Sequence, residues 1–252
     1  MENGSVVSEV KNGIGTITFG HPQSNSLPSV ILNRLAEAIL AMGKDDAVRI
    51  IVLKSAGEKT FCAGASFDEL IAIDTLEKGR EFFSGFAKVI NACRKVDQLI
   101  IGRVQGKAVG GGVGIASSVD YCFATKHADV KLSELAVGIG PFVVGPAVER
   151  KIGLSGMSEL AINASAWRSA TWAKEKGLYT ELFDSIDAMD EAVDQLALRL
   201  AASNPEAMKE LKKIFWQGTD HWDELLMERA GISGKLVLSD FTRNAIQAFK
   251  VK

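Results

Sequence analysis

The 252-residue chain has few of the residues that build metal or disulfide sites. It contains three cysteines and three histidines, and the members of each set lie far apart in the sequence. The cysteines are Cys62, Cys93 and Cys122. An odd number at such spacings forms neither a disulfide framework nor a Cys-x-x-Cys metal pair. Because the histidines are equally isolated, we expect no bound metal.

The chain also lacks an excess of either charge. Its 29 Lys and Arg residues nearly balance 31 Asp and Glu residues, and the formal net charge is −2. Without a long basic run, binding to nucleic acid or to an anionic membrane surface is not expected. No apolar run is long enough to span a bilayer, and the first residues lack the basic and apolar regions of a signal peptide. These absences favour a cytoplasmic protein.

What is present is a strand and helix pattern typical of an α/β fold. Hydrophobic residues make up 47% of the chain, which is enough for a sizeable core. Strands are predicted over residues 5–10, 14–20, 48–53, 99–104, 119–124 and 130–135. Helices are predicted over residues 27–42, 76–96, 111–118, 144–152, 155–163, 172–176, 188–202, 205–216, 221–231 and 235–249. Strands alternate with helices in the middle of the chain, and the last quarter is helical. We therefore expect a core over residues 1–190 and a helical C-terminal region over residues 191–252.

Residues 106–118 form the most informative stretch of the chain. They follow an apolar strand and contain Gly110, Gly111 and Gly112 in succession. Bare glycine N–H groups at the start of a short helix can bind a negatively charged group. A Walker loop is excluded because Ala108 follows Gly-Lys, and no frame fits the G-x-G-x-x-G dinucleotide motif. A tight packing turn is equally compatible with these glycines, but a second small-residue loop at 61–66 favours a binding site.

Four segments in the right order resemble the crotonase superfamily, the enoyl-CoA hydratases and isomerases. Residues 61–66, Phe-Cys-Ala-Gly-Ala-Ser, are similar to the family's F-x-A-G-A-D segment. Residues 105–112 resemble its second glycine loop, and Asp120 matches the acidic residue that follows. Residues 20–27 resemble the R-P-x-x-x-N-A-L segment, and residues 157–182 resemble the A-x-x-x-G-L-V stretch. The resemblance covers essentially the whole chain.

The resemblance implies a spiral of β-β-α units followed by helices that take part in trimerisation. Members bind an acyl-CoA thioester and form an enolate whose oxygen lies between two backbone N–H groups. By position these belong to Ala65 and Gly111. Coenzyme A would then be part of the substrate, and no separate cofactor is expected. The residues expected to hold it are Asn25, Ser26, Ala63, Gly64 and Gly110. A homotrimer or dimer of trimers is implied, in which Lys252 could reach a neighbour's CoA phosphate.

One departure from the hydratase pattern bears on the reaction. Hydratases carry a glutamate at the position of Gly114 and a second at the position of Glu134, and only the second is present here. Moving a double bond needs one base, whereas water addition needs an activated water and a delivered proton. Residues 138–142 also look more like the isomerase-type segment. The sequence therefore predicts an enoyl-CoA isomerase with Glu134 as base.

Two alternatives stay open at this point. One is a hydratase that uses Glu134 alone, and the other is a degenerate member that binds CoA esters or serves as a structural subunit. Glu134 could also be a solvated carboxylate at a strand end. Asp68 and Glu69 are expected in a first helical turn, where they could act as a substitute acid. Ser66 replaces the family's aspartate, and serine can cap the following helix equally well.

Overall fold

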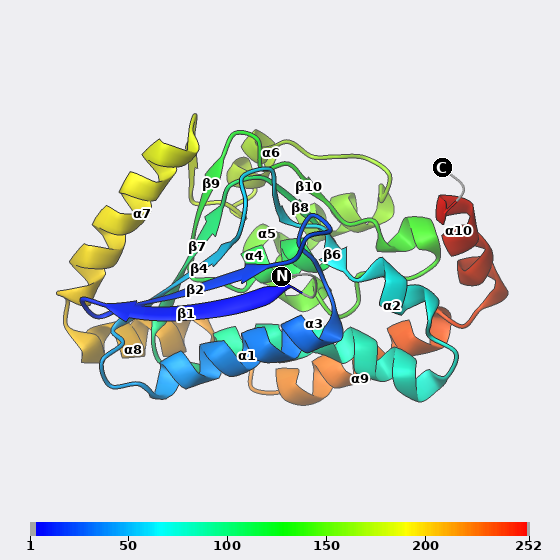
Figure 1. Cartoon of the computed structure of the whole chain (residues 1–252), viewed down its shortest axis with the longest axis horizontal. Coiled ribbons are helices and arrows are strands. Elements are labelled where there is room, and N and C mark those ends of the chain that lie inside the picture. Colours follow the sequence, from blue (N-terminus) through cyan, green and yellow to red (C-terminus); the bar gives the residue numbers. More distant parts are fainter. Residues whose placement is uncertain (1–3, 251–252) are drawn as a thin grey trace.

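A six-stranded sheet forms the centre of the computed structural model, which describes residues 4–250 (Figure 1). Its strands, in spatial order, are β1 (Ser5–Lys11), β2 (Ile14–Gly20), β4 (Ile50–Ser55), β7 (Leu99–Val104), β9 (Tyr121–Thr125) and β11 (Glu181–Phe183). Strands β1 and β2 pair antiparallel, and the other neighbours are parallel. The β1–β2 turn holds Asn12 and Gly13 at φ of 53° and 78°, as the Asn-Gly pair predicts.

Helices surround this sheet, and Figure 1 shows most of them gathered along its two sides. They are α1 (Ser29–Lys44), α2 (Phe67–Ile71), α3 (Leu76–Lys95), α4 (Gly111–Ser117), η1 (Glu134–Val137, a 3₁₀ turn), α5 (Gly145–Ile162), α6 (Ala170–Glu175), α7 (Ile186–Ala201), α8 (Pro205–Phe215), α9 (Trp222–Leu236) and α10 (Asp240–Lys250). Helix α3 packs against both α1 and α9, and α7 packs on the strands.

The alternation of side chains along β4 explains why both faces of the sheet are covered. Ile50 and Val52 join a buried cluster with residues of α7, whereas Ile51 and Leu53 join the larger core with residues of α1 and α3. Successive strand residues point to opposite faces. A nearly continuous apolar strand is therefore typical of a parallel sheet with helices on each side.

Two smaller sheets carry the glycine-rich loops. One has the order β10 (Val130–Lys131), β8 (Lys107–Val109) and β5 (Thr60–Cys62), and the other pairs β3 (Ser26–Leu27) with β6 (Gly64–Ala65). Strands β5 and β8 run parallel, with Cys62 opposite Ala108. This pairing brings together the ends of two segments that are more than 40 residues apart in the sequence.

A buried ion pair ties helix α8 to the sheet. The Lys212 ammonium lies 2.6 Å from Asp120 Oδ2, and both side chains are less than 5% exposed. The Trp216 indole donates to Asp120 Oδ1 at 2.8 Å, and the Ile100 N–H donates to Oδ2 at 2.8 Å. Asp120, which matches an acidic residue of the family's second loop, therefore has a structural role at the start of β9.

The predicted strands and helices are confirmed in most places, but two differ clearly, and the short strands β3, β5, β6, β8 and β11 were not predicted. The predicted strand 130–135 ends at Lys131, and η1 follows. The predicted break between helices at 231–235 is wrong, because α9 continues to Leu236 and the next helix begins at Asp240. The two helices predicted over 144–152 and 155–163 are confirmed, because Gly153 is non-helical, with φ of 70° and ψ of 167°, and divides α5 between them.

Close packing explains why glycines do not end helix α9. A Cβ atom on Gly234 would lie 2.6 Å from the backbone nitrogen of Arg80, and one on Gly79 would lie 2.8 Å from the Gly234 Cα. These glycines therefore allow α3 and α9 to approach backbone to backbone. The sequence showed the glycines but not the partner helix.

The expected boundary between residues 190 and 191 falls inside α7. Moreover, Trp216, Trp222 and Leu226 belong to the same buried cluster as core residues of β2 and α1. The C-terminal helices thus contribute side chains to the main core. Within residues 4–250, no helix combines the length and the apolar character needed to cross a membrane.

Candidate active site

The two glycine-rich loops meet where β5 and β8 end. Gly64, at φ of 93°, lies so close to the second loop that a Cβ on it would be 3.7 Å from the Gly111 nitrogen. Gly111 is the first residue of α4, and the first N–H groups of a helix have no partner within it. Ala65 and Gly111 both line one cavity, as do Ala63, Gly64 and Gly110. The structure therefore brings both predicted N–H donors to the same space.

Each glycine of the second loop lies against another group of the site. Gly110 has φ of 52°, and a Cβ on it would lie 2.9 Å from Glu134 Oε1. A Cβ on Gly111 would overlap the ring of Phe86, and one on Gly112 would overlap the Cys62 carbonyl. Larger residues at Gly110 or Gly111 would therefore push the loop away from Glu134 and from α3.

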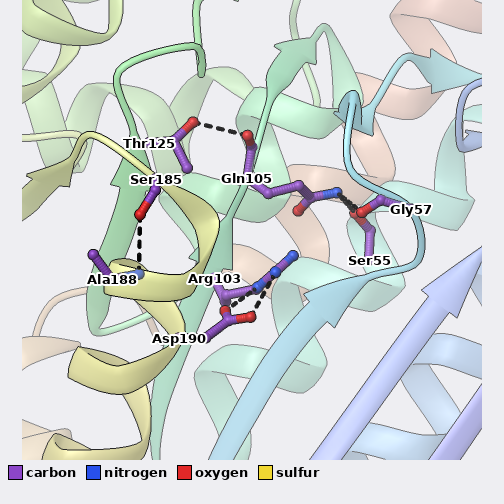
Figure 2. Close-up of polar contacts among 8 residues, drawn as sticks. All are labelled: Ser55, Gly57, Arg103, Gln105, Thr125, Ser185, Ala188 and Asp190. Atoms are coloured by element: carbon purple, nitrogen blue, oxygen red, sulfur yellow. Dashed lines mark hydrogen bonds and ion pairs between the residues drawn. The ribbon is translucent and has the colours of Figure 1, made fainter.

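Buried polar contacts fix the strand that leads into this loop, and Figure 2 shows them. The Gln105 side-chain amide donates to Ser55 Oγ at 2.9 Å and to the Gly57 carbonyl at 3.0 Å. The Thr125 hydroxyl donates to the Gln105 carbonyl at 2.8 Å. Two residues earlier, Arg103 forms a bidentate pair with Asp190 of α7. Sequence reasoning placed Gln105 in the motif but missed this supporting role.

Glu134 begins η1, and its carboxylate lies beside Gly110. The residue is half-buried, but its Oε2 atom is inaccessible to solvent and has no hydrogen-bond partner among the described residues. Burial raises the pKa of Glu134 to about 7, and a hydrogen bond from its own backbone N–H opposes this only in part. A carboxylate with such a pKa can accept and return a proton near neutral pH. The interpretation of Glu134 as a solvated strand-end residue is therefore wrong.

The cavity between the loops and Glu134 has a volume of about 290 Å³ and a largely apolar lining. Five phenylalanines contribute to it: Phe67, Phe82, Phe83, Phe86 and Phe142. Among the described residues that line the cavity, Glu134 is the only carboxylate and Lys131 the only other charged residue. One acid in an apolar cavity beside backbone donors suits the removal of a proton next to a carbonyl.

Comparison with known proteins agrees with this geometry. The model of the family described as enoyl-CoA hydratase/isomerase matches residues 9–250. The chain belongs to the enoyl-CoA hydratase/isomerase family. It is 28% identical to a short-chain-enoyl-CoA hydratase of Clostridium acetobutylicum over 99% of this chain and 95% of the relative. It is 27% identical to the carnitinyl-CoA dehydratase of Escherichia coli K12 over 81% of this chain and 78% of the relative.

Solved structures of other proteins share the fold. An enoyl-CoA hydratase from Bacillus halodurans superposes with a TM-score of 0.89 at 20% identity, covering 96% of this chain and 99% of that one. The OdaA structure from Pseudomonas aeruginosa superposes with a TM-score of 0.86 at 22% identity, covering 98% and 99%. The predicted crotonase fold is confirmed.

At position 114, where the sequence comparison with hydratases expects a glutamate, the side chain of Val144 occupies the space beside Gly114. A Cβ built on Gly114 would lie 2.5 Å from Val144 Cγ1 and 2.8 Å from Val144 Cβ. Gly114 lies within helix α4 and is not one of the glycines with positive φ. A side chain at position 114 is therefore excluded because Val144 occupies its space. The backbone conformation of Gly114 would allow one. Sequence reasoning identified the missing glutamate but not the valine that takes its room.

Asn25 and Ser26, expected to hold coenzyme A, support the loops in the structure. The buried Asn25 amide donates to the carbonyls of Ala56 and Thr60 at 2.8 and 2.9 Å, and its Oδ1 accepts from the His21 N–H. The Ser26 hydroxyl donates to the Ala65 carbonyl at 2.8 Å. Both lie outside the set of described residues that line the cavity. Their contact with coenzyme A stays a prediction.

The acidic residues after the first loop also have other partners. Ser66 caps α2 by accepting from the Glu69 N–H at 3.3 Å, as expected. Glu69 Oε2 accepts from the N–H and hydroxyl of Ser29 at 2.9 and 2.6 Å, which caps α1. Asp68 accepts from Gln23 at 3.2 Å. Neither acid is among the described lining residues, which leaves Glu134 as the candidate base. Lys252 lies outside the described residues.

Proposed function

We propose that the protein moves a double bond in an enoyl-CoA thioester from the 3 to the 2 position. Glu134 takes a proton from C2, and the electron pair of that C–H bond shifts toward the thioester oxygen. The N–H groups of Ala65 and Gly111 stabilise this oxygen. As the C3–C4 double bond moves to C2–C3, Glu134 returns the proton to C4. No atom is gained or lost, and no separate cofactor is required.

The observation that carries this proposal is the Glu134 carboxylate, whose buried Oε2 has no partner among the described residues, in a cavity whose described lining holds no second acid. The base and the donor loops lie side by side, because Gly110 contacts Glu134. The space near Gly114, where a second acid could bind water, holds the Val144 side chain. Proton transfer by Glu134, with the two backbone N–H groups as donors, requires no second acid in the site.

The substrate follows from family membership and from the names of relatives. Those relatives are named for acyl-CoA substrates, and we extend this class to the present chain. Asn25 and Ser26 would act by holding the first loop, and Ala63, Gly64 and Gly110 would lie against the thioester. The homotrimer or dimer of trimers implied by the family is part of this proposal.

Water addition by Glu134 alone is the second candidate. It is favoured by the names hydratase and dehydratase among the relatives. In that reaction Glu134 would have to activate the water and the proton would have to reach C2 from the same side chain.

Panels of 3-enoyl-CoA and 2-enoyl-CoA esters separate these candidates. With a 3-enoyl-CoA we expect the conjugated 2-enoyl thioester to form, with little 3-hydroxyacyl product. Faster water addition to 2-enoyl-CoA than isomerisation would overturn the proposal in favour of a hydratase. Acyl-CoA binding without either reaction would mean that the chain is a non-catalytic CoA-ester binder.

A further inference from the structure

Helix α3 runs along the cavity, so the cavity has an end near the two glycine-rich loops and an end far from them. Phe86 lies at the near end, because its ring occupies the space beside Gly111. Phe82 also lines the cavity, one helical turn away from Phe86. One turn advances about 5.4 Å along a helix. Phe82 therefore lies farther from the donor loops than Phe86 does.

The far end is closed by packed side chains from five segments. Phe82 and Ile139 line the cavity and belong to a buried cluster with Ile73, Val237 and Ile246. Ile246 comes from α10, and it is only 5% exposed. The far wall is therefore backed by a helix from the end of the described chain, and it does not lead directly to solvent.

Helix α10 also contacts the segment that follows Glu134. A Cβ on Gly138 would lie 2.5 Å from atoms of both Phe241 and Thr242, and Thr242 is fully buried. Gly138 ends the turn η1 in a left-handed conformation, at φ of 80°. This second contact fixes α10 in its place behind the cavity.

The size and chemistry of the far end limit what it can hold. Leu70, Phe82, Val137 and Ile139 line the cavity with carbon atoms alone in their side chains. The whole cavity measures about 290 Å³. If each carbon of an acyl chain needs the room of one water molecule, roughly 30 Å³, there is space for about ten carbons.

From these contacts we infer that the site selects apolar acyl groups of up to about eight to ten carbons, and that Phe82, backed by Ile246 of α10, sets this limit. The inference rests on the proposed function, because it places the thioester beside the two loops. It adds a substrate class and names the residues that define it. An acyl group with a carboxylate at its far end is excluded because the wall offers that charge no partner.

Saturated acyl-CoA esters test the limit without any double-bond chemistry. Isothermal titration with even-numbered chains from four to sixteen carbons should show affinity rising about fourfold per buried CH₂, since each is worth about 0.8 kcal/mol. The rise should stop at about eight to ten carbons. Affinity that keeps increasing up to sixteen carbons, or that does not depend on length, would overturn the inference.

Substitutions at the wall should move the limit. We expect F82A, and to a smaller extent I246A, to extend the preferred chain by two or more carbons. F82L tests the same wall with a smaller loss of packing if F82A does not fold. F215A is the matched control, because Phe215 is 47% exposed on α8 and is not among the described lining residues. An unchanged limit in folded F82L and I246A would overturn the assignment of the wall.

The two proposals fail in different ways. If the length limit is found but 3-enoyl-CoA esters are not isomerised, the proposed function fails and the size of the acyl site stands. If isomerisation is found without a length limit, the inference about the far wall fails and the proposed function stands.

Discussion

At the scale of single residues, the environment of Glu134 makes it the base of the proposed reaction. Its Oε2 is buried without a partner among the described residues. E134Q keeps the size of the side chain but cannot accept the proton. We expect isomerase turnover to fall by about 10²–10⁴-fold while a saturated acyl-CoA still binds. Steady-state assays and titration calorimetry measure the two effects, and unchanged turnover would place the base elsewhere.

The raised pKa of Glu134 also predicts a pH dependence of stability. Burial raises the pKa of Glu134 to about 7 in the folded protein, whereas the ordinary pKa of an exposed glutamate is 4.5. Below pH 4.5 Glu134 is neutral in both the folded and the unfolded state, and its burial carries no cost of burying a charge. As the pH rises from 4.5 through about 7 the group ionises, and the free energy of unfolding falls. Relative to wild type, E134Q should melt at a higher temperature at pH 8 and at a similar one at pH 4. Equal differences at both pH values would contradict this.

Gly114 and Val144 form a second residue-scale prediction. G114E alone should lower the free energy of unfolding by about 1–3 kcal/mol, because Val144 occupies the space of the new side chain. In the G114E/V144G double variant the glutamate has room. We expect stability to recover in urea unfolding and water addition to 2-enoyl-CoA to increase. A double variant as unstable as G114E would show that other contacts exclude the side chain.

At the scale of secondary-structure elements, the Lys212–Asp120 pair fixes helix α8. K212M leaves the Asp120 carboxylate buried without its cation, which should cost about 3–5 kcal/mol of unfolding free energy. K213M on the same helix is the matched control, since Lys213 pairs with Glu210 on the exposed surface. That change should cost less than about 1 kcal/mol. Similar losses in the two variants would contradict a special role for the buried pair.

Elements whose signals are local could be predicted from the sequence. Strands β4 and β7 could be predicted because each contains a run of β-branched residues. The turn into α4 could be predicted because of its consecutive glycines. The continuation of α9 through Gly234 could not be predicted, because it depends on contact with Gly79 more than 150 residues earlier. For the same reason, the filling of the Gly114 space by Val144 and the capping of α1 by Glu69 were missed. Each depends on which distant segments meet.

At the scale of the whole molecule, exposed apolar side chains predict association between subunits. Among the C-terminal apolar residues, Leu211, Ile214 and Phe241 are 44%, 63% and 69% exposed, whereas Leu226 is fully buried. Leu154 and Ile162 of α5 are also exposed. We expect a trimer or hexamer in light scattering at micromolar concentration. A monomer at that concentration would contradict the prediction.

The contact of α10 with the far wall has a consequence for protein synthesis. The base and both donor loops leave the ribosome more than one hundred residues before Ile246 does. At a synthesis rate of about 5–20 residues per second, this delay is on the order of 5–20 seconds. During that interval a nascent chain can hold the reactive groups of the site while the far wall of its cavity still lacks the helix that backs it. Ribosome-bound chains stalled before residue 240 would then expose apolar side chains that α10 normally covers. Chaperones could bind this surface until α10 docks.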